Sequence, residues 1–194
     1  MKKTLGILCM AAMVTMFGCK KDETEETKFD NKVFVQEIFN AGMMWNAQGK
    51  ALKSSYHIYI DVDNTVTGIE GGTIHVLGNV SGNMNIDDQT GAITGGTMLL
   101  GLTETINDFT LTSDGKTFTI NGAPYISLAG TFTLQPGGST FGTASSMEIG
   151  GGYRVTGDGY DQTVNVQLTI IINTNGTGGT VSGNINGVAV HYTL

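Results

Sequence analysis

A two-residue period in the apolar side chains constrains the fold of this chain more than any other feature. From Ser54 onward, aliphatic and aromatic residues recur at every second position, in runs separated by turn dipeptides. Such alternation is typical of strands that bury one face, and closely spaced turns join such strands as antiparallel neighbours. The sequence therefore predicts an all-β domain, an antiparallel meander of about ten strands that forms a barrel or a sandwich. The main alternating runs are 56–62, 74–86, 126–134 and 164–172.

Three turn dipeptides predict the register of individual hairpins. Two-residue turns at Asp114-Gly115, Asn175-Gly176 and Asn186-Gly187 would each place apolar or glycine positions opposite one another on one face. A slip of one residue would turn each set to the wrong face, so the register is strongly specified. The expected pairs are Leu111 with Phe118, Phe109 with Ile120, Ile170 with Val181, Leu168 with Gly183, Val166 with Ile185, Ile185 with Val188, Gly183 with Val190 and Val181 with Tyr192.

Residues 74–86 leave two arrangements open. Thirteen residues at about 3.4 Å each would make a strand much longer than the usual five or six residues. One long strand could bend at Gly78 and Gly82, since glycine inside a strand often marks a bend. An additional hairpin with a three-residue loop would also keep the apolar residues of this segment on one face.

Residues 30–45 are the one segment with a helical period. Asp30 or Asn31 could cap a short helix, and its apolar stripe would dock on the sheet as part of the core. Use of Trp45 as a platform for a ligand is the alternative. The stripe consists of Phe34, Ile38, Ala41 and Trp45.

The amino-terminal residues have the three-part layout of an export signal. Two lysines precede an apolar stretch, Leu5–Phe17, which is too short to span a bilayer because a spanning helix needs about 20 residues. The segment Met16–Cys19 resembles the lipobox of bacterial lipoproteins. The resemblance implies that residues 1–18 are removed and that Cys19 carries the attached lipid.

A polar leader, Lys20–Glu26, follows this cysteine and contains no apolar residue, so it is expected to be a solvated tether. A Lys/Asp/Glu cluster at this place resembles the surface-export signal of Bacteroidota lipoproteins. The resemblance implies an outer-membrane protein that faces the cell exterior and contacts the membrane through its lipid anchor alone. The expected organisation is a signal peptide at 1–18, lipidated Cys19 and tether at 19–28, and a single β domain with a leading helix at 29–194.

The cysteines and the charge distribution exclude several classes of function. Cys9 would be removed with the signal and Cys19 would be lipidated, which leaves no disulfide and no cysteine nucleophile in the domain. Beyond Lys53 the only lysine or arginine residues are Lys116 and Arg154. Because neutralising phosphates requires clustered cations, nucleic acid is excluded as a partner.

Carboxylates gather at one predicted strand end, where Asp61, Asp63 and Asn64 lie across a turn from Glu70. Oxygen ligands of this kind can hold calcium, but no complete calcium loop follows. Solvated carboxylates at the end of a strand are the preferred interpretation.

No other set of residues predicts a metal site or catalysis. His57, His75 and His191 fall on the polar sides of their strands, with a spacing that does not predict zinc binding. No serine lies in a Gly-x-Ser-x-Gly elbow. We therefore expect no catalytic residue, metal or cofactor, and the protein is expected not to be an enzyme.

Aromatic residues offer a possible ligand surface. Tyr59 is predicted to point away from the buried face of its strand, and Tyr125, Tyr153 and Tyr160 lie near turns. Exposed rings among Asn, Asp and Thr suit neutral glycans. Cross-strand packing of the same rings is the structural alternative.

A helix followed by a meander is loosely similar to the lipocalin-like barrels found among surface lipoproteins. This resemblance implies a ligand cavity but assigns no residue to it, so the ligand-binding residues are unknown. The expected function is that of a non-catalytic lipoprotein that binds a small apolar or glycan ligand or an envelope protein. The alternative is an adhesin or fimbria-associated structural protein. A cavity lined by the even-numbered aliphatic residues would favour the first function, and a filled core with an unpaired edge strand the second.

Overall fold

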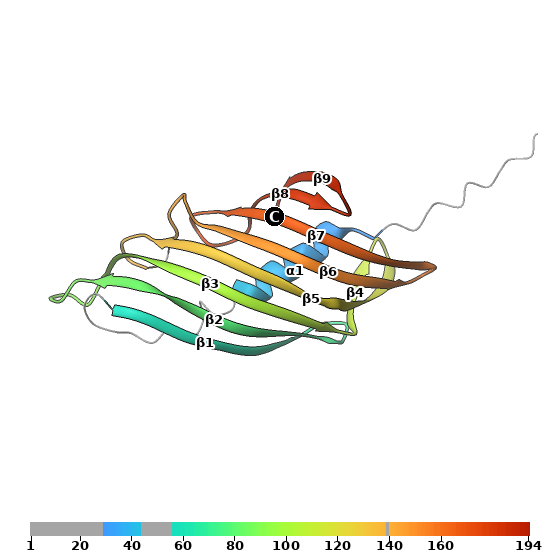
Figure 1. The fold of residues 1–194 in the computed structure, drawn as a ribbon, viewed down its shortest axis with the longest axis horizontal. Coiled ribbons are helices and arrows are strands. Elements are labelled where there is room, and N and C mark those ends of the chain that lie inside the picture. The colour runs from blue at the N-terminus through green and yellow to red at the C-terminus, as the bar shows by residue number, and fades with distance from the viewer. Residues whose placement is uncertain (1–28, 44–55, 139) are drawn as a thin grey trace, which may run out of the picture.

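A computed structural model describes residues 29–43, 56–138 and 140–194, and this part of the chain contains one helix and nine strands (Figure 1). The residues alternate between the two faces of each long strand, which fits the two-residue period of the sequence. The elements are α1 (Asn31–Met43), β1 (Tyr56–Thr67), β2 (Thr73–Ile86), β3 (Ile93–Asn107), β4 (Phe109–Ser113), β5 (Lys116–Leu134), β6 (Ser146–Gly157), β7 (Tyr160–Ile172), β8 (Gly179–Ile185) and β9 (Val188–Thr193).

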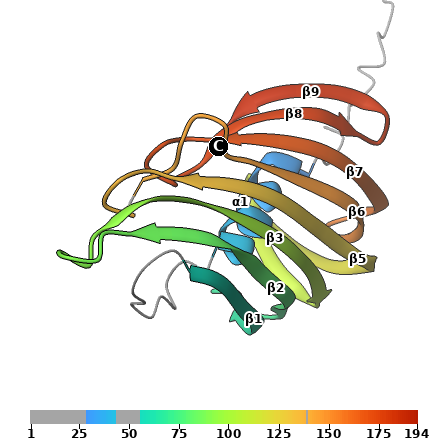
Figure 2. The ribbon, with the colours of Figure 1, turned by 60° about the vertical axis from the view of Figure 1, so that its left-hand side comes forward.

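The nine strands form one antiparallel sheet in the order β1-β2-β3-β5-β6-β7-β8-β9, and β4 pairs with β5 beside this path. The sheet curves, and α1 lies against its inner face (Figure 2). The predicted all-β meander with one short leading helix is confirmed. The sequence left a barrel and a sandwich open, and the sheet is not closed into a barrel. The fold resembles a sandwich only in having two layers, because the described residues form a single sheet and α1 supplies the second layer.

The helix begins after Asp30, whose Oδ1 accepts a hydrogen bond of 2.9 Å from the backbone N–H of Lys32. This is the contact expected of an N-cap residue, which satisfies a backbone donor of the first turn. Phe34, Ile38 and Ala41 of the predicted stripe are buried. Trp45, the last residue of that stripe, lies outside the described residues.

The three predicted hairpin registers are confirmed. Asp114-Gly115 and Asn186-Gly187 are the two-residue connections expected, because Ser113 pairs with Lys116 and Ile185 pairs with Val188. The connection around Asn175-Gly176 is wider than predicted, since β7 ends at Ile172 and β8 begins at Gly179. The pairing is unchanged because the wider loop remains centred on the same dipeptide.

Residues 74–86 belong to one continuous strand, β2, so the alternative of an additional hairpin is wrong. Two glycines let the neighbouring strand β3 approach closely. A Cβ atom at Gly78 would lie 2.1 Å from the carbonyl oxygen of Gly101, and one at Gly82 would lie 2.1 Å from that of Thr97. The backbone φ angles of 151° and 159° at these glycines are also unfavourable for other residues.

The inner face of the sheet and the buried side of α1 form one apolar core. Aromatic rings gather at the amino-terminal end of α1, where Phe34 lies 4.7 Å from Tyr153 and 5.9 Å from Phe109 between ring centroids. The predicted buried faces are confirmed at Ile58, Val62, Ile74, Val76, Val80, Ile126, Leu128, Phe132, Leu134, Val164, Val166, Leu168, Ile170 and Ile172.

Candidate functional site

The predicted lipid-attachment residue, Cys19, lies outside the described residues, together with the remainder of 1–28. The lipid anchor therefore stays a prediction. In the described part of the chain, no helix has the length and apolar character needed to cross a membrane.

The acidic residues at the end of β1 do not converge on one point. Asp61 and Asp63 are exposed, and Oδ1 of Asp63 lies 2.8 Å from Nε2 of His75. Glu70 instead accepts a 2.8 Å hydrogen bond from the hydroxyl of Thr112. Among the described residues, no group of three or more His, Cys, Asp and Glu side chains is arranged to hold a metal ion. The calcium alternative therefore has no assembled site in this part of the chain.

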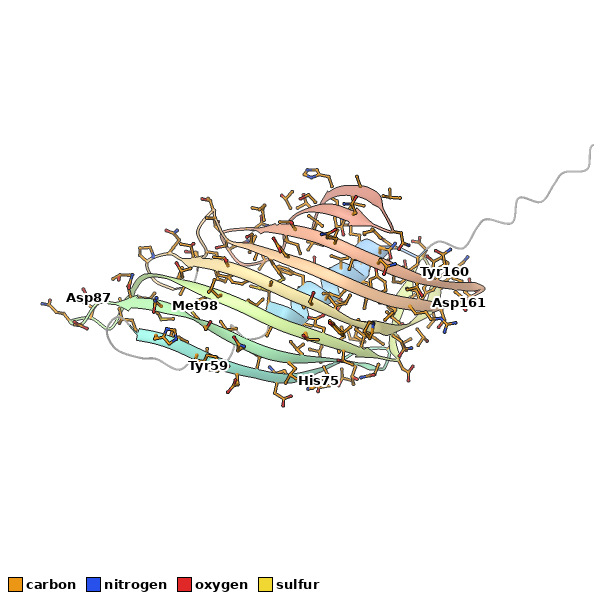
Figure 3. All side chains as sticks on the ribbon, viewed as in Figure 1. Tyr59, His75, Asp87, Met98, Tyr160 and Asp161 are labelled. Carbon is orange, nitrogen blue, oxygen red and sulfur yellow. The ribbon has the colours of Figure 1, made fainter. Side chains whose placement is uncertain are left out.

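The three histidines lie apart on the outer side of the sheet. His57 and His75 are on β1 and β2, whereas His191 is on β9 at the other end of the strand order. Figure 3 shows His75 at the β1 edge of the sheet. His57 lies 3.4 Å from Oδ1 of Asn83, and no zinc-type convergence brings the three rings together.

The four tyrosines considered as a glycan surface divide into two groups. Tyr59 and Tyr125 are exposed, at 60% and 49% of their surface. Tyr153 is fully buried and donates a 2.8 Å hydrogen bond to Oδ1 of Asn31, so its assignment to an exposed surface is wrong. Tyr153 lies two residues before buried Val155 on β6, so both side chains point to the inner face of the sheet. A nearby turn does not change this alternation. Tyr160 is half-buried against the ring of Phe118.

The outer face of the sheet is polar and carries little unneutralised positive charge. Arg154 donates two hydrogen bonds, of 2.8 and 2.7 Å, to the carboxylate of Asp161. These bonds hold the pKa of Asp161 below its usual range. Lys116 lies 3.3 Å from the carboxylate of Asp158. The large apolar side chains exposed in this part of the chain include Tyr59, Leu77, Leu99, Tyr125 and Ile171.

One carboxyl group, that of Glu104, lies inside the apolar core. It occupies an inward position of β3 between buried Leu102 and Ile106, and none of its surface is exposed. Its neighbours on the adjacent strands are Val76 and Ile126. Neither carboxyl oxygen has a hydrogen-bond partner in the described structure. Sequence reasoning missed this residue, although a glutamate at an apolar position of the two-residue period was the signal that could have found it.

The carboxyl-terminal half of α1 covers Glu104. A Cβ atom at Gly42 would lie 3.5 Å from Oε1 of Glu104 and 2.6 Å from Cδ2 of Leu128, so the missing side chain permits this close approach. Burial raises the pKa of the Glu104 carboxyl well above its ordinary value, because an ionised carboxylate is poorly solvated among apolar groups. The group is therefore held neutral beneath the helix over a wider pH range than a solvated glutamate.

An open cleft of about 520 Å³ borders the same half of α1. Inside it, Gln36 donates a 2.9 Å hydrogen bond from Nε2 to Oδ1 of Asn40. A second open cleft, of about 410 Å³, lies beside the β7–β8 connection. Most of the predicted even-numbered aliphatics belong to the core and line neither cleft, with Ile172 in the second cleft as an exception. The first cleft is lined by Gln36, Phe39, Asn40, Met43, Gly176, Thr177, Gly178 and Leu194.

No protein-family model, curated protein or solved structure matches this chain.

Proposed function

We propose that the chain is a lipid-anchored lipoprotein of the outer membrane, facing the cell exterior, that acts by binding and not by catalysis. The lipid would be attached at Cys19, after removal of residues 1–18. The lipobox-like segment and the polar leader support this location. The β domain, from Phe29 onward, would then carry the binding function.

The outer face of the sheet is the surface proposed to bind, and its polar, cation-poor character is the observation that carries the proposal. The inner face of the sheet packs against α1 and its aliphatic residues belong to one apolar core, which leaves the outer face as the accessible surface of the sheet (Figure 2). On the outer face, Tyr59 and Tyr125 stand among Ser, Thr and Asn side chains. Such a surface suits a neutral glycan, which offers hydroxyl groups for hydrogen bonds and apolar ring faces for tyrosine.

Affinity electrophoresis of the full chain through neutral polysaccharides, such as mannan, xylan and dextran, tests the glycan proposal. We expect retardation by at least one polysaccharide and weaker retardation of Tyr59→Ala and Tyr125→Ala. Ile171→Ala, which removes an exposed apolar side chain from β7, is the matched control. The glycan proposal fails if no polysaccharide retards the chain, or if the control weakens binding as much as the tyrosine variants.

Protease treatment of intact cells tests the location separately. The domain should be digested from cells that remain closed, and Cys19→Ser should abolish its membrane attachment. Complete protection of the domain on intact cells would contradict exposure at the surface.

The edges of the open sheet favour a second candidate function, that of an adhesin or fimbria-associated protein. The backbone N–H of Leu194 donates a hydrogen bond of 2.9 Å to the carbonyl oxygen of Gly179. In this register the backbone N–H groups of the even-numbered residues of β9 point towards β8. Ala189 and His191 then direct their N–H groups outward, where no described strand pairs with them. Unpaired strand edges of this kind can add a strand from another molecule.

Sedimentation velocity of the full chain at increasing concentration tests edge association. Ala189→Pro removes one outward N–H group and should reduce assembly without breaking the β8–β9 ladder. Ala189→Ser, which keeps the N–H group, is the control. An assembly unaffected by proline would exclude the β9 edge.

A further inference from the structure

The carboxyl-terminal half of α1 covers a group whose charge depends on pH. Glu104 has no exposed surface and no hydrogen-bond partner among the residues that the structure describes, and Gly42 of α1 lies against it. Removing the proton would leave a charge among apolar side chains with no described group to compensate it, which is strongly unfavourable. Movement of this half of the helix away from the sheet would expose that charge to water.

The contacts that hold α1 are unevenly distributed along its length. Its polar contacts with the sheet, Asn31 with Tyr153 and Lys32 with the ring of Tyr192, are in the first turn. In the described structure, no hydrogen bond joins residues 36–43 to the sheet. The cleft of about 520 Å³ also gives this half an open flank. The glycine at position 42 further lowers helix stability there.

We propose that Glu104 makes the seating of the carboxyl-terminal half of α1 dependent on a proton. With its proton, the carboxyl stays neutral and residues 36–43 remain against the sheet. Opening of this half exposes Glu104 to water and releases that proton to solvent, while the amino-terminal half stays anchored. The equilibrium constant for opening then rises about tenfold per pH unit between the ordinary glutamate pKa and the raised pKa of Glu104, and levels off above it.

The charged groups described on the elements around Glu104 do not account for its raised pKa. On α1, Lys32 lies over Tyr192, and Glu37 is half-buried one turn before Ala41. His75 of β2 contacts Asp63 on the outer face. Lys116 of β5 contacts Asp158, while Glu148 and Arg154 of β6 are exposed. Burial alone accounts for the raised pKa of Glu104.

Hydrogen–deuterium exchange of the full chain between pH 5 and pH 9, corrected for intrinsic exchange rates, tests this proposal. Once it leaves the sheet, the segment 36–43 is too short to stay helical on its own, so its amide hydrogen bonds open. Residue-resolved protection should therefore fall with pH by up to tenfold per unit in 36–43, with little change in 31–35. Glu104→Gln keeps the shape but cannot ionise, so its protection should not depend on pH. Glu104→Leu provides a second non-ionising variant if the amide impairs folding. Glu148→Gln removes an exposed carboxylate and should behave like the parent chain.

Three results would overturn the proposal. Protection in 36–43 could be independent of pH in the parent chain, or it could fall equally in Glu104→Gln and Glu104→Leu. Protection could also fall together in both halves of α1, which would indicate whole-helix or global opening. Failure of surface exposure or glycan binding would leave these measurements unaffected, because they concern only α1 and the inner face.

Discussion

The two ends of α1 meet the same sheet in opposite ways. At the amino-terminal end, Phe34 lies among aromatic rings and Asn31 accepts the hydrogen bond of buried Tyr153. At the carboxyl-terminal end, Gly42 covers the carboxyl of Glu104, which has no hydrogen-bond partner in the described part of the chain, beside an open cleft. Burial strengthens the aromatic and hydrogen-bond contacts at the amino-terminal end, whereas at the carboxyl-terminal end it makes ionisation of the Glu104 carboxyl unfavourable. One short helix can therefore combine a firm anchor with a weakly held end.

Breaking the aromatic anchor should have the largest effect. Phe34→Ala is expected to lower the free energy of unfolding by about 3–5 kcal/mol, because a fully buried ring is removed and a cavity remains. Urea denaturation followed by circular dichroism measures this loss. Leu99→Ala removes an exposed side chain from the outer face and should change stability by less than about 0.5 kcal/mol. A loss below about 1 kcal/mol for Phe34→Ala would mean that the rings do not anchor the helix.

Replacing the buried carboxyl should strengthen the weak end. Glu104→Leu is expected to raise the free energy of unfolding by about 1–3 kcal/mol at pH 4, since it removes a buried polar group that has no partner among the described residues. Urea denaturation at fixed pH measures the gain. Ser127→Ala, at an exposed position of β5, serves as a control for a substitution outside the core. A stability loss in Glu104→Leu would indicate that the carboxyl has a favourable role in the fold.

The same variant should reveal how stability depends on pH. Because the folded pKa of Glu104 is raised, its protonation stabilises the fold fully below the unfolded pKa, and this contribution is lost as pH rises towards the folded pKa. The advantage of Glu104→Leu should therefore grow above about pH 4.5, by at most about 1.4 kcal/mol per pH unit. A constant advantage from pH 4 to pH 9 would contradict this assignment.

A side chain at position 42 should show how tightly the weak end is seated. Gly42→Ala gains about 1 kcal/mol of helix propensity but places a methyl group against Leu128, and overpacking costs about 1–3 kcal/mol. We expect a net loss of about 1 kcal/mol. In the Leu128→Ala background the same change should become stabilising, which a double-mutant cycle measures. Equal effects in both backgrounds would exclude Leu128 as the obstacle.

The smallest effect is expected at the edge of the anchored end. Nζ of Lys32 lies 5.4 Å from the ring centroid of Tyr192, and burial raises the pKa of that tyrosine to about 12, so its ring is neutral at pH 7. Lys32→Gln should cost about 0.5 kcal/mol by removing the cation. Thermal unfolding measures the change, with Lys32→Arg as the variant that keeps the charge. An equal loss for arginine and glutamine would show that the charge contributes nothing.

Sheet register was predictable because it depends on local sequence. Asn186-Gly187 specifies a short turn, and the alternating residues beside it have only one register that buries them together. The width of the β7–β8 connection was less predictable. The backbone N–H of Asn173 bonds to the carbonyl of Gly178, which closes a wider loop with the same centre.

The unequal ends of α1 could not be predicted because they depend on contacts distant in the chain. Asn31 and its partner Tyr153 are 122 residues apart. Strand parity could have placed both Tyr153 and Glu104 inside the core. It could not have shown that Tyr153 finds a hydrogen-bond partner there while Glu104 finds none among the described residues, since this depends on where the helix rests.

The meander order of the sheet has a consequence for how the chain folds. Apart from the β3–β5 pairing around β4, every pairing joins consecutive strands. Local pairings of this kind form quickly because little chain entropy is lost in closing short loops. We expect the sheet to grow hairpin by hairpin. The helix, although first in the chain, must wait until β6 supplies Tyr153 before its anchor is complete, so its docking should be among the latest folding events.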